Sequence, residues 1–573
     1  MDKKQIAKIL EEFGILLDLK GENPFRVRSY INGARAVENL SEDIGELVES
    51  GELLKVKGIG KGLAAGITEL MNTGKYQDYE TLKNSFPPGV LDMLRIGGLG
   101  PKKVKIIYQK LGVSSVGELE YAAKENRLRT LEGFGAKSET NILEGIEVFK
   151  RGQGRFLTHI ARRWADYVLT CLSGHPDIQR IDLAGSLRRR RETSKDIDIV
   201  AAAENAANIM DAFTEMDEVE QVIARGETKS TVRLHSGISV DLRVVKNAEY
   251  PFLLHHLTGS KEHNTLMRSR AKKLGIKMNE YGLFKDDTLI ACEDETAIFQ
   301  ALQLSYIPPE LREGLDELDR AETGDVLQLI ADEDMHGILH VHTTHSDGVG
   351  TVEQMVQAAS ERGATFIGIT DHSQTAVYAN GLNAQRVQEQ HEEIDRLQQQ
   401  YPDIRIFKGI ESDILPDGSL DYPDDVMASF DFVIASIHSK FKMDEREATD
   451  RVLNAIRHPH VHMLGHPTGR LLLGRDGYPV NMPEVIAAAR EANVVIELNA
   501  NPHRLDIDWR HLPATMEQGV AIAINSDAHR ISDYDHIPVG VGIARKGRVM
   551  REQVMNTWTV EQVETFFREG YGS

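Results

Sequence analysis

The chain has very little cysteine and no long apolar segment. Only Cys171 and Cys292 occur among 573 residues, which leaves no disulfide framework and no thiolate metal site. No run of about 18 apolar residues is present, so the sequence predicts no membrane span. The N-terminus, MDKKQIAKILEEFGILL, mixes charged and apolar residues at helical spacing, which is typical of a helix and not of a secretion signal. We therefore expect a globular, cytoplasmic protein.

Positive charge is also in short supply. The formal net charge is −21, which at first argues against nucleic acid as a partner, because phosphate binding needs positive potential. The deficit is uneven, however. Residues 1–150 carry 22 Lys or Arg against 22 Asp or Glu, whereas residues 336–573 carry 21 against 34. The acidity lies in the C-terminal part, where carboxylates can hold cations.

The chain is too long for one hydrophobic core, and its local patterns divide it. Residues 1–150 show helical periodicity broken by short glycine turns. From about Leu183, short β-branched runs predict a small sheet. The acidic stretch 316–335 has no strand pattern and is the predicted linker. After it, strands such as TFIGIT and FVIASI alternate with helical stretches, which predicts a βα repeat and a barrel.

Three glycine hairpins punctuate the helical region, at 56–62 (VKGIGKG), 96–103 (IGGLGPKK) and 131–138 (LEGFGAKS). A Gly-hydrophobic-Gly turn that opens a helix exposes backbone N–H groups to a phosphate oxygen. One such turn is as well explained by helix packing. Three of them, each followed by a lysine, favour binding of the DNA backbone without regard to base sequence. The glycines are Gly58, Gly60, Gly98, Gly100, Gly133 and Gly135, and the lysines are Lys61, Lys102 and Lys137.

A pair of aspartates in AGSLRRRRETSKDIDIV, residues 184–200, predicts a metal site. Asp196 and Asp198 are two apart on a strand and so face one side, and Asp241 in ISVDLRVV would join them from a neighbouring strand. Three carboxylates around two Mg²⁺ suit in-line phosphoryl transfer. A lone Asp-x-Asp pair is equally well explained by solvated carboxylates, but the Gly185–Ser186 turn lies ten residues upstream and offers free N–H groups to phosphate.

Histidines gather at predicted strand ends after residue 336. The motifs are HGILHVHTTHSDG, ITDHS, KGIESDI, IASIHS, LGHPTGR and INSDAH. The C-terminal rim of a barrel collects residues at such positions. Neutral imidazole and carboxylate together suit Zn²⁺, Mn²⁺ or Fe²⁺, and several bridged ions suit phosphoester hydrolysis. Any one of these histidines alone would be explained as a surface or capped residue, but six motifs together predict a metal centre.

The first half of the chain resembles the family X DNA polymerases, on the segments GSLRR, DIDIV, GETK (226–229) and LTGSKEHNTLMR (257–268). The resemblance covers residues 1 to about 315. It implies that Asp196 and Asp198 bind both metals and that Asp241 activates the primer 3′-hydroxyl. It further implies a set of nucleotide-binding residues: Gly185, Ser186, Arg188, Gly259, Asn264 and Arg268.

Two positions depart from that family's pattern. Polymerase beta has a tyrosine-phenylalanine pair before its Thr-Gly-Ser turn, where this chain has His256 and Leu257, so discrimination against ribonucleotides is not carried over. At the position of the family's Schiff-base lysine this chain has Gly66, which cannot form an imine. Lys61 is nearby, but a solvated lysine at a helix end explains it better. We expect weak or absent deoxyribose-phosphate lyase activity.

Residues 336–573 resemble the polymerase and histidinol phosphatase (PHP) domain. The resemblance implies up to three ions, Mn²⁺, Zn²⁺ or Fe²⁺. Arg470 and Lys440 are candidates for contact with a substrate phosphate, and His345, His458, His460, His462 and His503 are expected to be structural or surface residues. The implied ligands are His340, His342, Glu411 and Asp527 for one ion, Glu411, His438 and His466 for a second, and Asp347, His372 and His529 for a third.

The order of the two resemblances predicts a bifunctional enzyme of the bacterial type. We expect a Mg²⁺- or Mn²⁺-dependent DNA polymerase that fills short gaps in base excision repair with deoxynucleoside triphosphates, acting as a monomer on gapped or primed DNA at the nucleoid. Its PHP domain would supply 3′-5′ exonuclease and 3′-end or abasic-site processing. The predicted parts are an N-terminal lyase-like helical domain (1–80), a helix-hairpin-helix subdomain (81–150), an α+β nucleotidyltransferase palm (151–250), a thumb (251–315), the linker (316–335) and a distorted TIM-like PHP barrel (336–573).

Three alternatives remain at this point. The PHP domain could act only as a scaffold for the polymerase, although all nine ligand positions hold a residue able to bind metal. The chain could be a non-enzymatic gap-binding protein built on the glycine hairpins. It could also be a phosphatase of small metabolites, which the preceding 315 residues of DNA-binding character disfavour.

Overall fold

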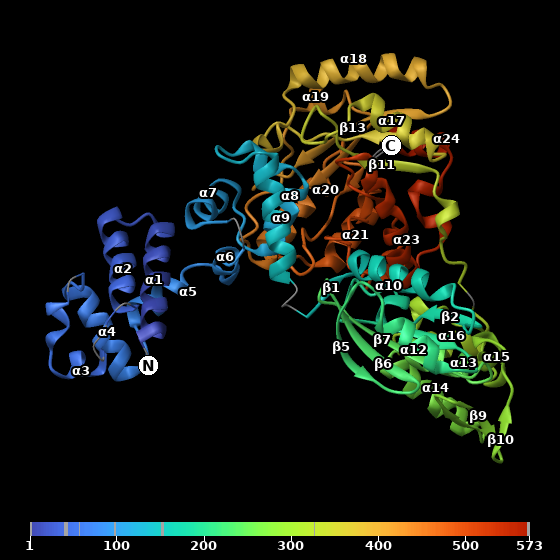
Figure 1. Cartoon of the computed structure of the whole chain (residues 1–573). Coiled ribbons are helices and arrows are strands. Elements are labelled where there is room, and N and C mark those ends of the chain that lie inside the picture. Colours follow the sequence, from blue (N-terminus) through green and yellow to red (C-terminus); the bar gives the residue numbers. More distant parts are fainter. Residues whose placement is uncertain are drawn as a thin grey trace. The chain divides into compact units, whose positions relative to one another are not determined.

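The computed structural model describes residues 3–38, 40, 44–56, 58–96, 99–150, 154–325 and 327–569. The chain divides into two compact units, Met1–Phe149 and Lys150–Ser573 (Figure 1). In the described ranges, no helix combines the length and apolar character needed to cross a bilayer.

The first unit is built of helices, as the periodicity of its sequence predicts. Its buried apolar side chains form one connected core, from Ile6 on the first helix to Ile146 on the last. Gly60 and Gly100 directly precede two of the helices as their N-terminal caps. The helices are α1 (Lys3–Lys20), α2 (Pro24–Glu38), α3 (Ile44–Glu49), α4 (Lys61–Thr73), α5 (Gln77–Asn84), α6 (Pro88–Met93), α7 (Pro101–Leu111), α8 (Val116–Lys124) and α9 (Ala136–Lys150).

The second unit opens with a five-stranded sheet of order β2-β4-β7-β6-β5, in which only β4 and β7 pair in parallel. Helices α10 and α12 pack on one face (Figure 1). Along β4, Ile197 and Ile199 enter that helical core, while Val200 lies on the opposite face against α13. The elements are β1 (Phe156–Leu157), α10 (Thr158–Ser173), β2 (Arg180–Leu183), α11 (Gly185–Arg188), β3 (Thr193–Ser194), β4 (Asp196–Ala202), α12 (Ala206–Thr214), β5 (Val219–Arg225), β6 (Lys229–Leu234) and β7 (Ser239–Val245).

A smaller subdomain follows the sheet and has its own apolar core. Its last helix, α16 (Glu317–Thr323), lies within the segment predicted as a linker. Ala321 belongs to the subdomain's core and Glu317 accepts a 2.9 Å hydrogen bond from His263, so the first part of that segment packs on what precedes it. The other elements are α13 (Tyr250–Thr258), α14 (Lys261–Lys273), β8 (Lys277–Asn279), β9 (Gly282–Lys285), β10 (Thr288–Ile290) and α15 (Glu295–Ala301).

The C-terminal part is a parallel barrel of seven strands in chain order. Its ends meet, because the His342 N–H donates to Ala528 O at 2.8 Å and the Ala528 N–H donates to His340 O at 3.1 Å. The predicted TIM-like barrel is thus confirmed, as a nearly closed ring of seven strands. They are β11 (Gly337–Val341), β12 (Phe366–Ile369), β13 (Arg405–Asp413), β14 (Phe432–Ser436), β15 (Met463–Leu464), β16 (Val495–Asn499) and β17 (Ile522–Asn525).

Apolar side chains fill the interior of the barrel near the N-terminal ends of its strands. One side chain or more from each strand contributes, Leu339, Phe366 and Phe432 among them, and Phe567 closes this layer from the last helix. The interior near the C-terminal ends of the strands holds polar side chains. Helices surround the strands (Figure 1): α17 (Val352–Glu361), α18 (Ala384–Gln400), α19 (Asp424–Met427), α20 (Glu445–Ile456), α21 (Met482–Ala492), α22 (Leu512–Glu517), α23 (Ile537–Lys546) and α24 (Val560–Glu569).

Candidate active sites

Three predicted carboxylates lie together on the five-stranded sheet. Asp196 and Asp198 share one side of β4, and Asp241 on β7 is the direct parallel partner of Asp198. Thr231 Oγ1 donates a 2.5 Å hydrogen bond to one oxygen of Asp241. Lys229 Nζ lies 3.3 Å from the other oxygen. Two side chains of β6 therefore hold Asp241 beside the pair on β4.

The electrostatics of these carboxylates fit a bound cation. Burial, followed by repulsion from Asp196 and Asp241, raises the pKa of Asp198 to about 6. Gly185 permits this close packing, since its φ is +64° and a Cβ there would lie 2.0 Å from Asp198 Oδ2. Neighbouring carboxylates that repel one another offer the oxygen ligands that Mg²⁺ or Mn²⁺ takes. The donor set thus suits the implied metals.

The predicted triphosphate turn is braced by the next subdomain. Ser186 Oγ lies 3.2 Å from Ser194 Oγ. Arg188 donates from one terminal nitrogen to Glu295 and from the other to Thr258 Oγ1, both at 2.7 Å. The guanidinium of Arg188 therefore joins the sheet to α13 and α15. Glu295 is a member of this site that the sequence alone did not single out.

The turn around Gly259 is closely packed. A Cβ at Gly259 would lie 2.3 Å from Asn264 Nδ2, so glycine is needed there. Asn264 donates from that nitrogen to His256 O at 2.7 Å, and Arg268 lies 3.4 Å from His256 Nδ1. The structure thus gathers the predicted nucleotide-binding residues of this segment around His256, one of the two positions that depart from polymerase beta.

All nine predicted PHP ligands meet at the strand ends of the barrel. Glu411, on β13, lies at their centre: His438 Nε2 is 3.1 Å and His466 Nε2 is 3.0 Å from its Oε1, and His340 Nε2 is 3.5 Å from the same atom. Such a carboxylate can bridge ions. His342 Nε2 lies 3.2 Å from Asp527 Oδ1, which adds the ligand from the last strand.

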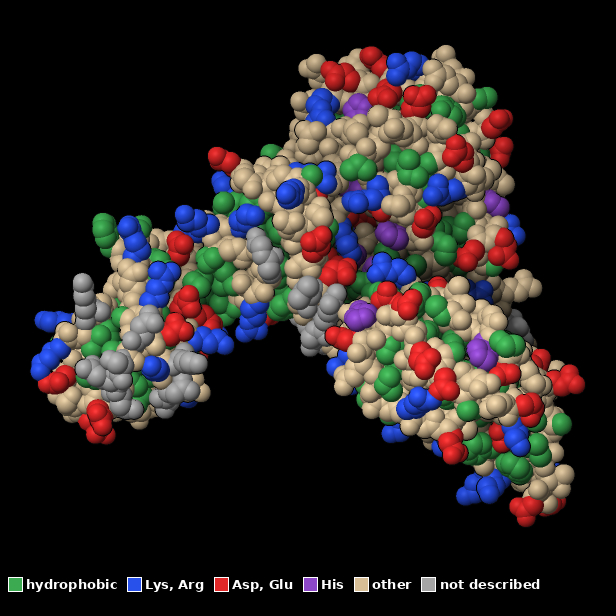
Figure 2. Space-filling model, viewed as in Figure 1, with side chains coloured by type: hydrophobic (Ala, Val, Ile, Leu, Met, Phe, Trp, Pro, Cys, Tyr) green, Lys and Arg blue, Asp and Glu red, His purple; other side chains and the backbone are tan. Residues whose placement is uncertain are grey.

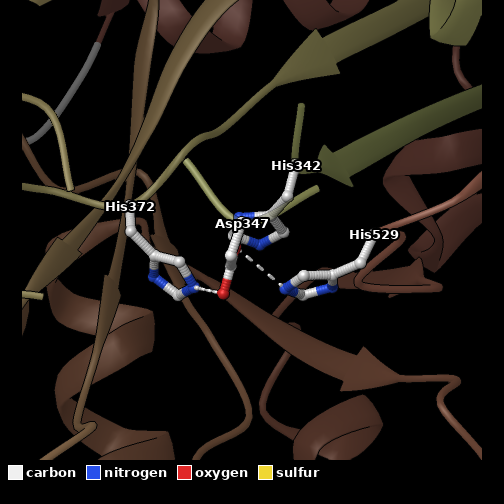
Figure 3. A group of neighbouring side chains, drawn as sticks. All are labelled: His342, Asp347, His372 and His529. Carbon is white, nitrogen blue, oxygen red and sulfur yellow. Dashed lines mark ion pairs between the residues drawn. The ribbon is translucent and has the colours of Figure 1, made fainter. Parts of the chain in front are cut away.

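A second part of the cluster surrounds Asp347 (Figure 3). His529 Nε2 lies 3.3 Å from one oxygen of Asp347, and His372 Nε2 lies 3.7 Å from the other. His342 stacks on His529 with ring centroids 4.2 Å apart. Ligand atoms of the four residues lie within 4.8 Å of one another, which is close enough for one ion.

Buried carboxylates behind the cluster orient its histidines. The Nδ1–H of His340 donates to Glu497 Oε1 at 2.7 Å, and that of His438 donates to Asp413 Oδ1 at 2.5 Å. Each bond turns the Nε2 lone pair toward the centre, the arrangement of metal-binding histidines. Sequence reasoning missed Glu497 and Asp413. The signal lies in the alternation of the strand, since Glu497 is two residues beyond the interior Val495.

The cluster fits metal ions by its unsatisfied atoms. His340 Nε2 and both ring nitrogens of His342 are buried without a hydrogen-bond partner among the described residues. Burial, and then His529 and His372, lowers the pKa of His342 to about 4, so it is a neutral ligand. In the metal-free cluster, burial would lower the pKa of His438, but Glu411 and Asp413 raise it to about 10, so an ion that binds Nε2 must displace its proton. Nitrogen and carboxylate donors of this kind take Zn²⁺, Mn²⁺ or Fe²⁺.

Arg504 brings a positive charge to the cluster. Its Nε lies 3.6 Å from Asp527 Oδ2, and the side chain is buried. The predicted phosphate ligand Arg470 supports it from behind, donating to Arg504 O at 3.0 Å and to Asp508 at 2.6 Å. Lys440, the other predicted phosphate ligand, is exposed. Arg504 is therefore a further candidate that sequence reasoning missed.

The remaining histidines of the barrel have other partners. His345 Nε2 lies 2.8 Å from Glu393, and His462 Nε2 lies 3.0 Å from Phe567 O. His503 is buried, and its ring contacts that of His159 with centroids 5.6 Å apart. None of these three belongs to a group of potential metal ligands in the part of the chain that the structure describes.

The glycine hairpins of the first unit present open backbone. Gly58 and Gly133 have φ of +100° and +84°, which favours glycine. A Cβ at Gly60, Gly100 or Gly135 would meet nothing within 4 Å. The lysines that follow are exposed, and Lys and Arg side chains are spread over the visible face of this unit (Figure 2). Gly98 lies outside the described residues.

Gly66 is packed where the lyase lysine would stand. A Cβ at this position would lie 2.9 Å from the ring of Tyr76. Tyr76 is buried, and its hydroxyl lies 3.0 Å from that of Tyr30. The ring occupies the space that a longer side chain needs.

Four family models match segments of the chain. They are the helix-hairpin-helix domain over residues 1–76, the SAM-like helix-hairpin-helix tandem over 90–147, the DNA polymerase beta thumb over 253–313 and the PHP domain over 339–501. These matches agree with the division of the fold into a helical region, a sheet with its following subdomain, and a barrel.

Curated proteins resemble either the whole chain or its barrel. The "DNA polymerase/3'-5' exonuclease PolX" of Bacillus subtilis is 40% identical over 572 residues, which cover 99% of this chain and 100% of that protein. A "Probable phosphatase" of Acetivibrio thermocellus is 28% identical over 241 residues, 40% of this chain and 93% of that protein. Another, of Thermoanaerobacter sp., is 27% identical over the same length, with the same coverage of both chains.

Proposed function

The chain belongs to the family X DNA polymerases that carry a C-terminal PHP domain, and we propose that it fills short gaps during DNA repair. It is a DNA polymerase with 3′-5′ exonuclease activity. We propose further that its substrates are gapped or primed DNA and deoxynucleoside triphosphates, that it acts as a monomer at the nucleoid, and that the PHP site also cleaves abasic sites.

In the proposed polymerase site, Asp196 and Asp198 hold the cations and Asp241 takes the primer 3′-hydroxyl proton. Divalent cations supply charge to neutralise the triphosphate and to acidify the attacking hydroxyl. Thr231 and Lys229 fix Asp241 on the adjacent strand, so its oxygens stay aligned with Asp198. The Gly185–Ser186 turn binds phosphate oxygens through backbone N–H groups, while Asn264 keeps the Gly259 turn beside the nucleotide.

In the proposed exonuclease site, the nine clustered residues would hold up to three ions, which would supply charge to polarise the phosphodiester and to acidify a water molecule. Glu497 and Asp413 keep His340 and His438 in the tautomer that presents Nε2. Arg504, beside Asp527, is placed to neutralise charge on a phosphate oxygen during cleavage.

The observation that carries the proposal is the pair of candidate metal sites in one compact unit, three carboxylates on the sheet and a cluster of six histidines and three carboxylates in the barrel. Single-turnover assays on a gapped duplex, in Mg²⁺ and then Mn²⁺, test it. Asp241→Ala should abolish extension and keep degradation, and Asp527→Ala should do the reverse. Degradation unchanged in Asp527→Ala would refute the exonuclease assignment, and extension unchanged in Asp241→Ala would refute the polymerase assignment.

A phosphatase activity at DNA 3′ ends is a second candidate. It is favoured by the similarity of the barrel to probable phosphatases over nearly their whole length. A primer that ends in a 3′-phosphate would be dephosphorylated by the same cluster and then extended. Comparison of that primer with a free phosphomonoester of a small metabolite separates end processing from a metabolic phosphatase.

A further inference from the structure

The last residue of helix α23 reaches from the barrel into the polymerase part of the same unit. Lys546 is buried, and its ammonium donates to Arg189 O and to Glu310 O, both at 3.2 Å. Its third partner is the carboxylate of Glu313. All three acceptors belong to the sheet and the subdomain after it. On its own side, Lys546 lies over the ring of Trp509, 4.6 Å from the centroid.

The contacts continue from Glu313 to the turn before Gly259. Glu313 lies 3.2 Å from Arg189 Nε. Arg189 then donates to Thr258 O at 2.5 Å, directly before Gly259. A run of charged contacts thus joins the barrel to the turn proposed to pass the sugar of the incoming nucleotide. Arg188 holds the same threonine through its hydroxyl, so two adjacent arginines fix one turn.

Burial makes this run of contacts sensitive to the loss of one member. The side chain of Lys546 has no exposed surface, and that of Glu313 is 12% exposed. Burial lowers the pKa of Lys546 to about 8, although Glu313 opposes this shift. Removal of the Lys546 ammonium would leave the buried Glu313 carboxylate with fewer partners. Glu313 would then draw its remaining cationic partners toward itself and change their positions. Arg189 and Arg191 are those cations.

Other ion pairs between the same two parts do not reach the turn. Arg548 binds Asp316, whose side chain is 49% exposed, and Arg545 binds Glu310 at 2.5 Å. These pairs contact the segment before the barrel and, among the described residues, make no bond with Arg189 or Thr258. They connect the barrel to the polymerase part without reaching the Thr258–Gly259 turn. Variants of these pairs therefore serve as controls for the loss of an inter-domain contact alone.

We propose that Lys546 is a positioning residue of the polymerase reaction, through which the barrel sets the Thr258–Gly259 turn for the incoming nucleotide. The proposal rests on the polymerase function proposed above. It gives the PHP domain a part in nucleotide binding that needs none of its metal ligands.

The test is single-nucleotide gap filling by the full-length protein over a range of nucleotide concentrations. Lys546→Met should raise KM for the nucleotide by about tenfold with a smaller change in kcat. A change of about this size is what the interaction free energy between contacting buried residues produces in a binding constant. The melting temperature should fall, because Glu313 loses a buried cation. The exonuclease rate, measured well below the melting transition, should stay near that of the parent. Arg548→Met, the matched control, should leave KM for the nucleotide within about twofold of the parent.

A second variant makes the result specific to the proposed contacts. Glu313→Gln, alone or combined with Lys546→Met, should give the same KM as Lys546→Met, because each breaks the same run of contacts. An unchanged KM in Lys546→Met, additive effects in the double variant, or an equal fall of both activities with the melting temperature would each overturn the proposal. Absence of nucleotide incorporation by the parent protein would instead count against the proposed function.

Discussion

His340 and Glu497 meet inside the barrel, where the imidazole Nδ1–H donates to the carboxylate at 2.7 Å although 157 residues separate them in the chain. Glu497 also accepts the backbone N–H of His466 at 2.7 Å. One buried carboxylate therefore sets the position of two of the proposed metal ligands. It binds no ion itself in the proposed site, yet the geometry of the ligands depends on it.

Replacement of Glu497 should weaken metal binding without removing a ligand. We expect Glu497→Gln to lower metal affinity and exonuclease rate by about 10- to 100-fold, the usual effect of losing the carboxylate behind a ligating histidine. Titration with Mn²⁺, followed by activity and by calorimetry, measures both. Glu491→Gln, on the exposed end of α21, is the matched control. Equal Mn²⁺ affinity in Glu497→Gln and the parent would contradict the role given to this carboxylate.

Polymerase activity should fall in acid as Asp198 takes a proton. Because burial and its neighbours raise the pKa of Asp198 from 3.8 to about 6, protons compete with Mg²⁺ from that pH downward. The apparent Mg²⁺ affinity, measured by incorporation at fixed nucleotide, should decrease as pH drops through about 6. Higher Mg²⁺ should restore the rate. A pH profile that Mg²⁺ does not move would be inconsistent with this competition.

The same protonation of Asp198 that lowers polymerase activity in acid should stabilise the fold of the metal-free protein. In metal-free protein the folded state binds the Asp198 proton at a higher pH than the unfolded state. The contribution of this group to the free energy of unfolding therefore increases as pH falls from about 6 to about 4. Urea unfolding of metal-free parent and Asp198→Asn protein over this range measures it. A pH dependence equal in the two proteins would rule it out.

Substitution of Gly66 should cost stability through Tyr76. A Cβ at Gly66 would overlap the Tyr76 ring, so Gly66→Ala should lower the free energy of unfolding by about 1–3 kcal/mol, as overpacked cores do. Gly174→Ala, at a glycine with φ of −83° and nothing within 4 Å of the added Cβ, should change it by less than about 0.5 kcal/mol. Denaturant unfolding of the full-length protein compares them. Gly66→Lys should likewise give no lyase product when trapped with borohydride on an abasic substrate.

The lysines after the glycine hairpins should bind DNA without regard to sequence. Loss of Lys61, Lys102 or Lys137 should each reduce the slope of log affinity against log salt by about one. Fluorescence anisotropy with two unrelated gapped duplexes should show the same reduction for both. Lys124→Ala, which removes a lysine paired with Glu120 at 3.1 Å, is the control. A loss confined to one DNA sequence would argue against backbone binding.

Strand-end motifs were enough to predict which histidines and carboxylates would lie together in the barrel. His340 and His342 lie on β11 and just beyond it, and Asp527 follows β17, because the ends of parallel strands collect at one rim. The alternation of side chains along a strand likewise predicted that Asp196 and Asp198, two residues apart on β4, would share a side. These features depend on local periodicity, which a single sequence displays.

Contacts between distant segments could not be predicted in this way. Glu497, Asp413 and Lys546 act on residues far along the chain, and an isolated acidic or basic residue in an apolar strand or helix carries no local mark of its partner. The ion pair of Arg188 with Glu295 was missed for the same reason. Helix α16 was missed because its sequence is mostly charged. Only Ala321 and Glu317 are buried, which is too few residues to show a helical pattern of apolar side chains.

The seam of the barrel has a consequence for how the protein depends on metal supply. Strands β11 and β17 meet there, and each side of the seam contributes ligands, His340 and His342 on one and Asp527 and His529 on the other. An ion bound between them would join the first strand of the ring to the last. Scarcity of metal would then loosen the ring as well as stop its chemistry, and the 3′-5′ exonuclease activity would follow the metal supply.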